Sequence, residues 1–229
     1  MDFELSKFYD NHIECNKIRD GNNEIYQKYI DDVIYWKLKK LKEVSGNINP
    51  SSILEVGCGI GFLIANAPFD TKPECRTGID ISSKNIEYAK KNFPLINFYA
   101  IDFEEFFRNN NKKYDLIILS DIIEHVINDK KLIIYAGDKS ENVLINLPLE
   151  KCYEYKNRNF GFEDFEGHLR AYDYNDAIQL IKDCGLEIIN FKVERYVEQP
   201  VFRKYLLRKI IGLKGKNIDS ILEYLERKT

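Results

Sequence analysis

Three glycines at alternate positions, Gly57, Gly59 and Gly61, mark the stretch whose residue types and spacing could do chemistry. They follow the apolar run Ile53–Val56, into which one acid, Glu55, is set. A strand that runs through such a loop into a helix leaves backbone N–H groups free, and glycine lets a ligand approach because it has no Cβ. The stretch therefore predicts a ligand-binding loop.

The spacing of these glycines distinguishes between two classes of ligand. A dinucleotide loop requires Gly-x-Gly-x-x-Gly, but here the third glycine comes one residue early and Phe62 stands in its place. Glu55, two residues before the first glycine, would repel a pyrophosphate and attract an ammonium or sulfonium group. The loop therefore favours S-adenosylmethionine, whose methionine end is cationic or zwitterionic. A β–α turn that binds no ligand is the alternative.

An acid follows the next predicted strand. Residues 75–79 form this strand, and Asp80 ends it about 20 residues beyond the glycine loop, where a carboxylate can accept hydrogen bonds from both hydroxyls of a ribose. Alternatively, Asp80 caps the helix predicted over 82–92, which Ser82 or Ser83 could cap equally well. We expect the ribose role.

A polar cluster follows the most continuous apolar run, residues 114–119, which predicts a central strand buried on both faces. Ligands of open α/β sheets bind at the carboxyl ends of the strands. The spacing of one helical turn lets the side chains in this cluster converge. They are Ser120, Asp121, Glu124 and His125.

The stretch Glu55-Val-Gly57-Cys58-Gly59-Ile-Gly61 resembles motif I of the class I S-adenosylmethionine-dependent methyltransferases. Several motifs in this order are specific for the cofactor and indicate little about the substrate. The similarity covers roughly residues 48–193 and continues through Gly78-Ile-Asp80-Ile-Ser82, Ile101-Asp102-Phe103, the stretch from Tyr114 to Val126, and Gly167-His168-Leu-Arg170.

The resemblance implies S-adenosylmethionine as cofactor and S-adenosylhomocysteine as product. In the family, an acid after the third strand accepts a hydrogen bond from the adenine amino group, and its neighbour packs on the ring. Asp102 and Phe103 hold these positions, and the alternative is that Asp102 caps the helix predicted over 103–108. The expected cofactor-binding residues are Glu55, Gly57, Cys58, Gly59, Gly61, Asp80, Ile81, Asp102, Phe103 and Ser120.

Two histidines are candidates for catalysis. Methyl transfer is an in-line displacement that mainly needs an aligned acceptor, but a hydroxyl acceptor also needs a base, and histidine titrates in the useful range. We predict that His168 is the base or orients the acceptor, with His125 second and Asp121 or Glu124 as orienting residues. A structural role is the alternative for each histidine, and the third, His12, has no motif context.

Arg170 would suit a phosphate or carboxylate on the substrate, because its guanidinium forms paired hydrogen bonds with such groups. Tyr9 and Tyr153 are two further candidate substrate contacts.

A carboxylate–histidine metal site is an alternative arrangement of the same cluster, similar to that of methyltransferases that modify the 3′-terminal ribose of small RNAs. Asp121 replaces a glutamate expected in that arrangement. We therefore predict no metal. The four residues of the alternative site are Asp121, Glu124, His125 and His168.

The sequence predicts one α/β domain with the Rossmann-like class I methyltransferase fold, in which helices cover both faces of a parallel-dominated sheet of six or seven strands. Residues 187–193 are the predicted sixth strand, and 196–198 are a poor candidate for a seventh. The expected parts are an N-terminal helical cap over 1–47, a cofactor-binding core over 48–193, a lid or substrate loop over 149–170, and a helical extension over 194–229.

Composition excludes several classes of protein. The 229 residues are 44% hydrophobic, which is typical of a globular chain. The net charge is only −3, so the chain has no overall positive charge that would attract nucleic acid. The five cysteines form no Cys-x-x-Cys pair, and neither a signal peptide nor a membrane span is evident, so we expect a cytoplasmic protein. Residues 199–218 contain six basic residues and no acid. The basic side chains, all within 201–216, could face an anionic substrate or a membrane surface. Alternatively, they form the solvated face of a helix.

Together these features predict a methyltransferase that acts on a small molecule, at oxygen rather than nitrogen. A sugar, a nucleotide-linked sugar or another phosphorylated metabolite is the first expectation. An RNA 2′-O-methyltransferase and a catalytically idle subunit that binds the cofactor are the alternatives.

Overall fold

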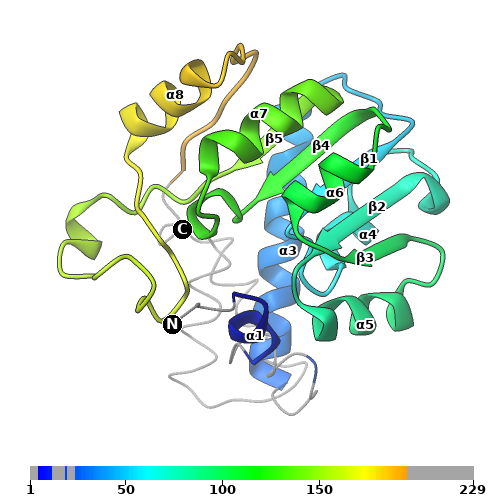
Figure 1. Cartoon of the computed structure of the whole chain (residues 1–229), viewed down its shortest axis with the longest axis horizontal. Coiled ribbons are helices and arrows are strands. Elements are labelled where there is room, and N and C mark those ends of the chain that lie inside the picture. The colour runs from blue at the N-terminus through cyan, green and yellow to red at the C-terminus, as the bar shows by residue number, and fades with distance from the viewer. Residues whose placement is uncertain (1–4, 12–18, 20–23, 195–229) are drawn as a thin grey trace, which may run out of the picture.

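A parallel sheet with helices on both faces forms the described part of the chain (Figure 1). The computed structural model describes residues 5–11, 19 and 24–194. The strands run in the order β3-β2-β1-β4-β5, and every neighbouring pair is parallel. They are β1 (Ile53–Val56), β2 (Arg76–Asp80), β3 (Asn97–Ala100), β4 (Tyr114–Ser120) and β5 (Ser140–Asn146).

The helices confirm the alternation of strand and helix that the sequence predicts. The long predicted N-terminal helix is α3, and short 3-10 turns interrupt three of the loops. The α-helices are α1 (Leu5–Asp10), α3 (Glu24–Ser45), α4 (Phe62–Asn66), α5 (Ser83–Asn92), α6 (Phe103–Asn109), α7 (Asp129–Lys139) and α8 (Tyr174–Asp183); the 3-10 turns are η1 (Pro73–Cys75), η2 (Ile123–His125) and η3 (Tyr153–Tyr155).

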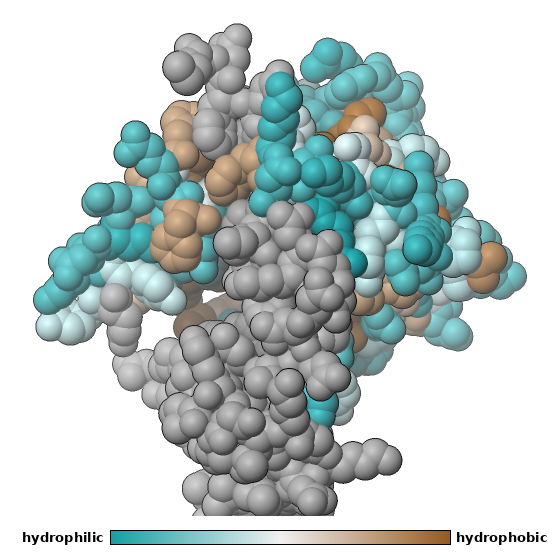
Figure 2. All heavy atoms as spheres, turned by 90° about the horizontal axis from the view of Figure 1, so that it is seen from below, coloured by the Kyte–Doolittle hydropathy of each residue, from teal (hydrophilic) through white to brown (hydrophobic). Residues whose placement is uncertain are grey.

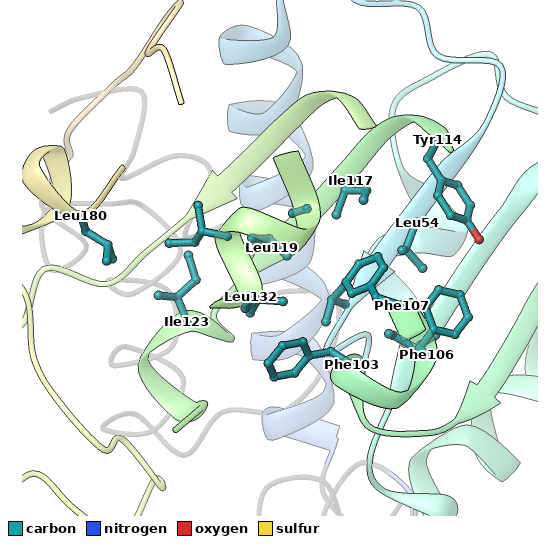
Figure 3. Close-up of a cluster of buried hydrophobic side chains, with 14 of the residues drawn as sticks. Leu54, Phe103, Phe106, Phe107, Tyr114, Ile117, Leu119, Ile123, Leu132 and Leu180 are labelled. Carbon is teal, nitrogen blue, oxygen red and sulfur yellow. The ribbon is translucent and has the colours of Figure 1, made fainter. Parts of the chain in front are cut away.

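Two hydrophobic cores lie on opposite faces of the sheet, because successive side chains of a strand alternate between faces. Ile53, Leu116 and Ile118 pack in one core beneath α3, α4 and α5. Leu54 and Leu119 pack in the other, beneath α6, α7 and α8, where Phe103, Phe106 and Phe107 fill the space over β4 and β1 (Figure 3). The two layers explain why the central strands read as continuous apolar runs.

The strand order contains one point at which the chain changes direction across the sheet. From β1 the chain continues to β2 and β3 on one side, and then returns to β4 on the other. The carboxyl ends of β1 and β4 therefore leave a gap between their outgoing loops, and ligands of such sheets bind there. This is the place at which the sequence predicts the glycine loop and the polar cluster.

The predicted sixth strand is wrong: residues 187–193 form no strand in the structure, and the described sheet has five strands. A strand needs a ladder of backbone hydrogen bonds to a neighbour. Here side chains hold the segment to the end of α3 instead, since Asn190 Nδ2 donates to the carbonyl of Val44 at 3.0 Å and Lys192 Nζ binds Glu43 at 2.8 Å. Ile189 is 83% exposed, so its apolar character did not indicate burial.

The candidate seventh strand at 196–198 and the basic stretch 201–216 lie outside the described residues. None of the described helices has the length and apolar character that crossing a membrane requires. Hydrophilic residues cover most of the described surface on the face seen from below (Figure 2).

Arg76, at the start of β2, is the buried cation that holds the loop beyond the glycine-rich stretch. It is 8% exposed. Its Nε donates to the carbonyl of Thr71 at 3.1 Å, and its terminal nitrogens donate to Ile64, Ala65 and Phe69 at 2.8 to 2.9 Å. One side chain thus satisfies four backbone carbonyls near the end of α4.

We predict that Arg76→Met lowers the free energy of unfolding by about 3 kcal/mol, because it leaves buried carbonyls without donors. Urea denaturation measures the change. Arg108→Met, at an exposed arginine of α6, is the control and should change stability by less than about 0.5 kcal/mol. Equal losses in the two variants would contradict the role assigned to Arg76.

Candidate functional site

The glycine loop connects β1 to α4 with a left-handed backbone at all three glycines. The φ angles of Gly57, Gly59 and Gly61 are 74°, 51° and 83°. A Cβ on Gly57 would lie 2.7 Å from the side chain of Ile122, and one on Gly61 would lie 2.8 Å from that of Phe98. A Cβ on Gly59 would meet nothing within 4 Å. Gly57 and Gly61 therefore let the side chains of Ile122 and Phe98 pack against the loop backbone, whereas Gly59 faces open space.

Asp80 joins the end of β2 to this loop. Its Oδ2 accepts a hydrogen bond from the N–H of Gly59 at 2.8 Å, and its Oδ1 accepts one from the N–H of Ser82, also at 2.8 Å. Burial raises the pKa of Asp80, and these two N–H groups partly oppose the shift. Ser82, not Asp80, provides the side-chain cap of α5, by accepting from the N–H of Asn85. The carboxylate therefore remains at the carboxyl edge of the sheet, beside Gly59.

Glu55 is a buried carboxyl group beneath the loop. It is 3% exposed, and its Oε2 has no hydrogen-bond partner among the described residues. Burial raises its pKa to about 8, a shift that the N–H of Ile64 and the charge of Lys37 oppose in part. At neutral pH this side chain is thus mostly protonated. Cys58 is also buried, and burial raises the pKa of its thiol, so it packs beneath the loop as a neutral group.

Asp121 follows β4 with a left-handed backbone, φ 51°, which is unusual for a residue other than glycine. Its carboxylate accepts hydrogen bonds from Ser120 Oγ at 3.1 Å and from Asn146 Nδ2 at 2.8 Å, and it pairs with the ammonium of Lys37 from α3. Burial lowers the pKa of Lys37, but the charge and hydrogen bond of Asp121, together with the charges of Glu124 and Glu55, outweigh burial and raise the pKa. These contacts of the Asp121 side chain offset the cost of its left-handed backbone conformation.

Sequence reasoning missed Lys37 and Asn146. The available signal for Lys37 was a lysine on the same helix face as Val33, Trp36 and Leu41, where it must either reach solvent or find a carboxylate. For Asn146 the signal was a polar residue at the carboxyl end of β5, next to the end of β4. Both signals depend on knowing which strand ends are neighbours.

Glu124, His125 and His168 meet beside Asp121. Glu124 is 1% exposed, and neither of its carboxyl oxygens has a hydrogen-bond partner among the described residues. Burial, followed by the charge of Asp121, raises its pKa well above the ordinary value. His125 Nε2 lies 3.7 Å from Glu124 Oε1, and the two imidazole rings pack edge to face with centroids 4.6 Å apart. The structure thus brings together the four residues predicted for catalysis.

The Nδ1 atoms of both histidines are already occupied. His168 Nδ1 lies 2.5 Å from Glu150 Oε2. His125 Nδ1 lies 3.0 Å from the carbonyl of Gly167 and 2.9 Å from the hydroxyl of Tyr9 in α1. Tyr9, a predicted substrate contact, therefore lies at the site.

Glu124, His125 and His168 can also hold a divalent cation. One ligand atom from each lies within 4.8 Å of the others. A carboxylate with two imidazoles is a donor set for divalent transition metals, and the unpartnered oxygens of Glu124 are the buried acceptors that such an ion would satisfy. The donor set therefore fits a cation, and the prediction of no metal remains untested.

Arg170, a predicted substrate contact, directs its guanidinium at backbone carbonyls in this structure, and its role toward a substrate stays a prediction. Its terminal nitrogens donate to the carbonyls of Val126 at 2.7 Å and Ile127 at 2.9 Å, and Asp129 lies 3.4 Å away. These contacts tie the segment after β5 to the turn after η2. Tyr153, in η3, is 77% exposed and stacks with Lys156.

Asp102 and Phe103 lie at the start of α6. Asp102 Oδ1 accepts the N–H of Glu104 at 2.8 Å, which is the capping role weighed as the alternative. Phe103 is 8% exposed within the core and packs against Tyr135, which leaves little of its ring for a ligand. Ile81, following Asp80, is half-buried. The adenine contacts predicted for these residues remain proposals.

A cavity of about 400 Å³ lies elsewhere, between β3 and α6 at the amino ends of the strands. Its lining includes Thr77, Asn97, Tyr99, Phe106 and Tyr114. None of the residues discussed above as candidates for catalysis or cofactor binding lines it, and open α/β sheets bind ligands at the opposite end of the strands.

Solved methyltransferase structures share this fold. The magnesium protoporphyrin IX methyltransferase of Synechocystis PCC 6803 aligns with a TM-score of 0.58 and 15% identity, over 84% of this chain and 90% of that one. A possible histamine N-methyltransferase of Thermotoga maritima aligns with a TM-score of 0.56 and 14% identity, over 77% and 81% of the two chains. At these identities the likeness shows the fold alone, and the fold is that of a methyltransferase.

The family described as "Methyltransferase domain" matches residues 26–190, more than half of the chain. This chain therefore belongs to the class I S-adenosylmethionine-dependent methyltransferases, which confirms the enzyme class and cofactor predicted from the glycine loop. It is 38% identical over 136 residues to the ubiquinone biosynthesis O-methyltransferase of Rickettsia typhi. The match covers 57% of this chain and 53% of that protein, so the chain spans about half the length of this relative.

We predict that Gly59→Ala weakens S-adenosylmethionine binding by about tenfold or more, since the new methyl group occupies the space that a ligand would use. Calorimetric titration measures the affinity. Gly46→Ala is the matched control, because Gly46 has a φ of 56° and also has nothing within 4 Å of an added Cβ, but lies at the end of α3.

Both glycine variants should lose about 1 kcal/mol of stability from the left-handed backbone. Only Gly59→Ala should lose affinity. Unchanged affinity in Gly59→Ala would show that the cofactor does not approach the loop at its middle glycine.

Proposed function

We propose that this chain transfers the methyl group of S-adenosylmethionine to an oxygen atom of a small molecule, at the gap between the carboxyl ends of β1 and β4. The observation that carries the proposal is the meeting of Glu124, His125 and His168 at the end of β4. The glycine loop follows the neighbouring strand β1, and Asp80, which binds that loop, ends β2 one strand further on. The similarity to ubiquinone biosynthesis O-methyltransferases supports oxygen as the acceptor atom.

In the proposed complex, Asp80 accepts hydrogen bonds from the ribose hydroxyls, and the backbone at Gly59 lies against the nucleoside. The methionine end lies toward Ser120 and Asp121, where the carboxylate of Asp121 suits its ammonium group and Lys37 suits its carboxylate. The buried Glu55 adds attraction for a cation. The adenine lies toward Ile81, Asp102 and Phe103.

The proposed chemistry is a single displacement. A lone pair of the acceptor oxygen attacks the methyl carbon, the carbon–sulfur bond breaks, and its electron pair stays on sulfur, which gives S-adenosylhomocysteine. The proton of the acceptor hydroxyl passes to His168 Nε2, the ring nitrogen opposite the one that contacts Glu150. Most of the rate enhancement comes from holding the oxygen in line with the methyl group.

The class of acceptor follows less directly from the site. Arg170 and the basic stretch 201–216 favoured a phosphorylated acceptor. The basic stretch lies outside the described residues, and backbone carbonyls engage the terminal nitrogens of Arg170. We therefore propose a small molecule with a hydroxyl group and no requirement for a phosphate. A sugar or a nucleotide-linked sugar remains within this class.

A second candidate is a cation-assisted form of the same reaction, which the unpartnered oxygens of Glu124 favour. The ion would be held by Glu124, His125 and His168. When bound, a divalent cation lowers the pKa of a coordinated hydroxyl, and this would replace the need for a base. His168 would then hold the ion instead of accepting the proton.

We predict that binding of S-adenosylmethionine at pH 7 releases up to one proton from Glu55. The pKa of this carboxyl is about 8 in the folded protein, so it is mostly protonated at pH 7, and a nearby sulfonium favours its ionised form. Calorimetry in buffers with different ionisation enthalpies measures the released protons.

Glu55→Gln should abolish the release, whereas Glu105→Gln, at an exposed carboxyl of α6, should leave it unchanged. Proton release that persists in Glu55→Gln would contradict the placement of the cationic end.

The raised pKa of Glu55 also predicts that its contribution to the free energy of unfolding falls as pH rises from about 4.5 to about 8. In this range the folded state holds a proton that the unfolded state has lost.

We predict that an acceptor screen over hydroxylated small molecules, with mass gain of one methyl group as the readout, finds a substrate whose turnover falls about 100-fold or more in His168→Ala. Adding and chelating Mn²⁺ separates the two candidates: a base at His168 needs no ion, whereas the cation-assisted form stops in chelator. Turnover that survives in both His168→Ala and chelator would contradict both forms. Binding of the cofactor without turnover of any acceptor would favour the idle subunit.

A further inference from the structure

We propose that Glu150 is a positioning residue, which fixes the proton of the His168 imidazole on Nδ1 and leaves Nε2 free to act. We further propose that Arg158 holds Glu150 in place. This inference deepens the proposed function and rests on it, because the use of a free Nε2 depends on the role of His168. Neither Glu150 nor Arg158 was singled out by the sequence.

The two oxygens of Glu150 have separate partners. Oε2 lies 2.5 Å from His168 Nδ1, and Oε1 lies 3.0 Å from a terminal nitrogen of Arg158. An ionised carboxylate can only accept hydrogen bonds, so the contact with Nδ1 requires the proton on that nitrogen. Glu150 follows β5, whereas His168 lies 18 residues later, so the contact closes the whole segment between them.

Arg158 gathers three carboxylates around one guanidinium. It donates to Asp164 through two nitrogens, at 2.7 and 2.6 Å, and it lies 2.8 Å from Glu166 and 3.0 Å from Glu150. Its side chain is only 8% exposed. Burial raises the pKa of Asp164 and the hydrogen bond from Arg158 lowers it, with a net result of about 2, so this pair stays ionised. Such paired bonds fix both distance and orientation.

Aromatic rings enclose the guanidinium. The carbon at its centre lies 5.0 Å from the ring centroid of Phe160, 4.9 Å from that of Phe165 and 5.8 Å from that of Tyr155. These contacts restrict the water that would otherwise compete for the carboxylates. The exposed aromatic residues of the segment thus have a role in its own packing.

The same cluster also fixes the backbone of His168. Asp164 Oδ1 accepts the N–H of His168 at 3.0 Å, and the carbonyl of His168 accepts the N–H of Gly161 at 2.9 Å. One residue further on, the N–H of Leu169 donates to the carbonyl of Glu124 at 2.9 Å. Backbone and ring are therefore held by different members of one network, which Arg158 connects.

The geometry on the other side of the ring explains why the tautomer matters. Nε2 of His168 lies 3.9 Å from Glu166 and on the side of the ring away from Glu150. With the proton on Nδ1, Nε2 carries a lone pair, which can accept a proton from a hydroxyl or bind an ion. With the proton on Nε2, neither reaction is possible. A carboxylate behind a histidine performs this function in metal sites and catalytic triads.

The chain is suited to a direct test, because it has only three histidines. Long-range ¹H–¹⁵N spectra of the ¹⁵N-histidine-labelled full chain, recorded over a range of pH, report which ring nitrogen carries the proton of the neutral imidazole. His168→Ala assigns the signals. We expect the proton of His168 on Nδ1 in the unmodified chain.

Glu150→Gln replaces one carboxylate oxygen with an NH₂ group. If the remaining oxygen accepts from Arg158, the NH₂ group faces Nδ1 and must donate to it, so we expect the proton to move to Nε2. Glu166→Gln is the matched control: it removes another carboxylate of Arg158 but does not touch Nδ1, so the proton should stay. On the acceptor found in the screen, Glu150→Gln should lower kcat about tenfold or more with little change in the KM for S-adenosylmethionine. Glu163→Gln, at an exposed carboxyl of the same segment, is the control for activity and should lie within about twofold of the unmodified enzyme.

A proton on Nε2 in the unmodified chain would overturn the proposal, and this result needs no variant to fold. A proton that stays on Nδ1 in Glu150→Gln would overturn it as well. If instead the tautomer follows Glu150 but His168→Ala retains full turnover, the positioning contact stands and the proposed role of His168 fails.

Discussion

The carboxylate of Asp80 makes the contact on which the rest of the site depends. One oxygen holds the N–H of Gly59 and the other holds that of Ser82, so a single side chain joins the loop after β1 to the start of α5. Gly59 has no side chain, and the space that a Cβ would enter is open. The main chain at Gly59 therefore stays accessible to a ligand at the point where Asp80 binds it. The contact exists only because β1 and β2 are adjacent and parallel, so that both chains leave the sheet at the same edge.

Acidic side chains at the neighbouring strand ends surround one buried lysine. Glu55, Asp121 and Glu124 bring three acidic groups together around the ammonium of Lys37, and burial raises the pKa of Glu55 and of Glu124. A cationic ligand changes the balance of charge among these groups, since it can replace protons as the source of positive charge. This arrangement suits a methyl donor that carries both an ammonium and a sulfonium.

Much of the fold was predictable from sequence, and the reasons for the failures are physical. Continuous apolar runs identified β1 and β4, since strands buried on both faces leave no polar alternation. The stretch 187–193 is also rich in apolar residues, but Glu187, Asn190 and Lys192 interrupt it. In the structure Asn190 and Lys192 bind Val44 and Glu43 at the end of α3, and the segment forms no strand. Arg170 has the chemistry to bind an anion, and in the structure it donates to the carbonyls of Val126 and Ile127, which the sequence did not indicate. Lys37 and Glu150 were missed because their partners lie 84 and 18 residues away, and only the fold brings them together.

The central claim is that the cofactor lies between the glycine loop and the end of β4. Backbone amide chemical shifts of the ¹⁵N-labelled chain, followed during titration with S-adenosylhomocysteine, test it most directly. The account predicts that the largest shifts occur at Gly59, Asp80 and Asp121. Shifts confined to the lining of the 400 Å³ cavity between β3 and α6, such as Thr77 and Tyr99, would contradict it, as would a titration of folded protein that shows no shifts at all.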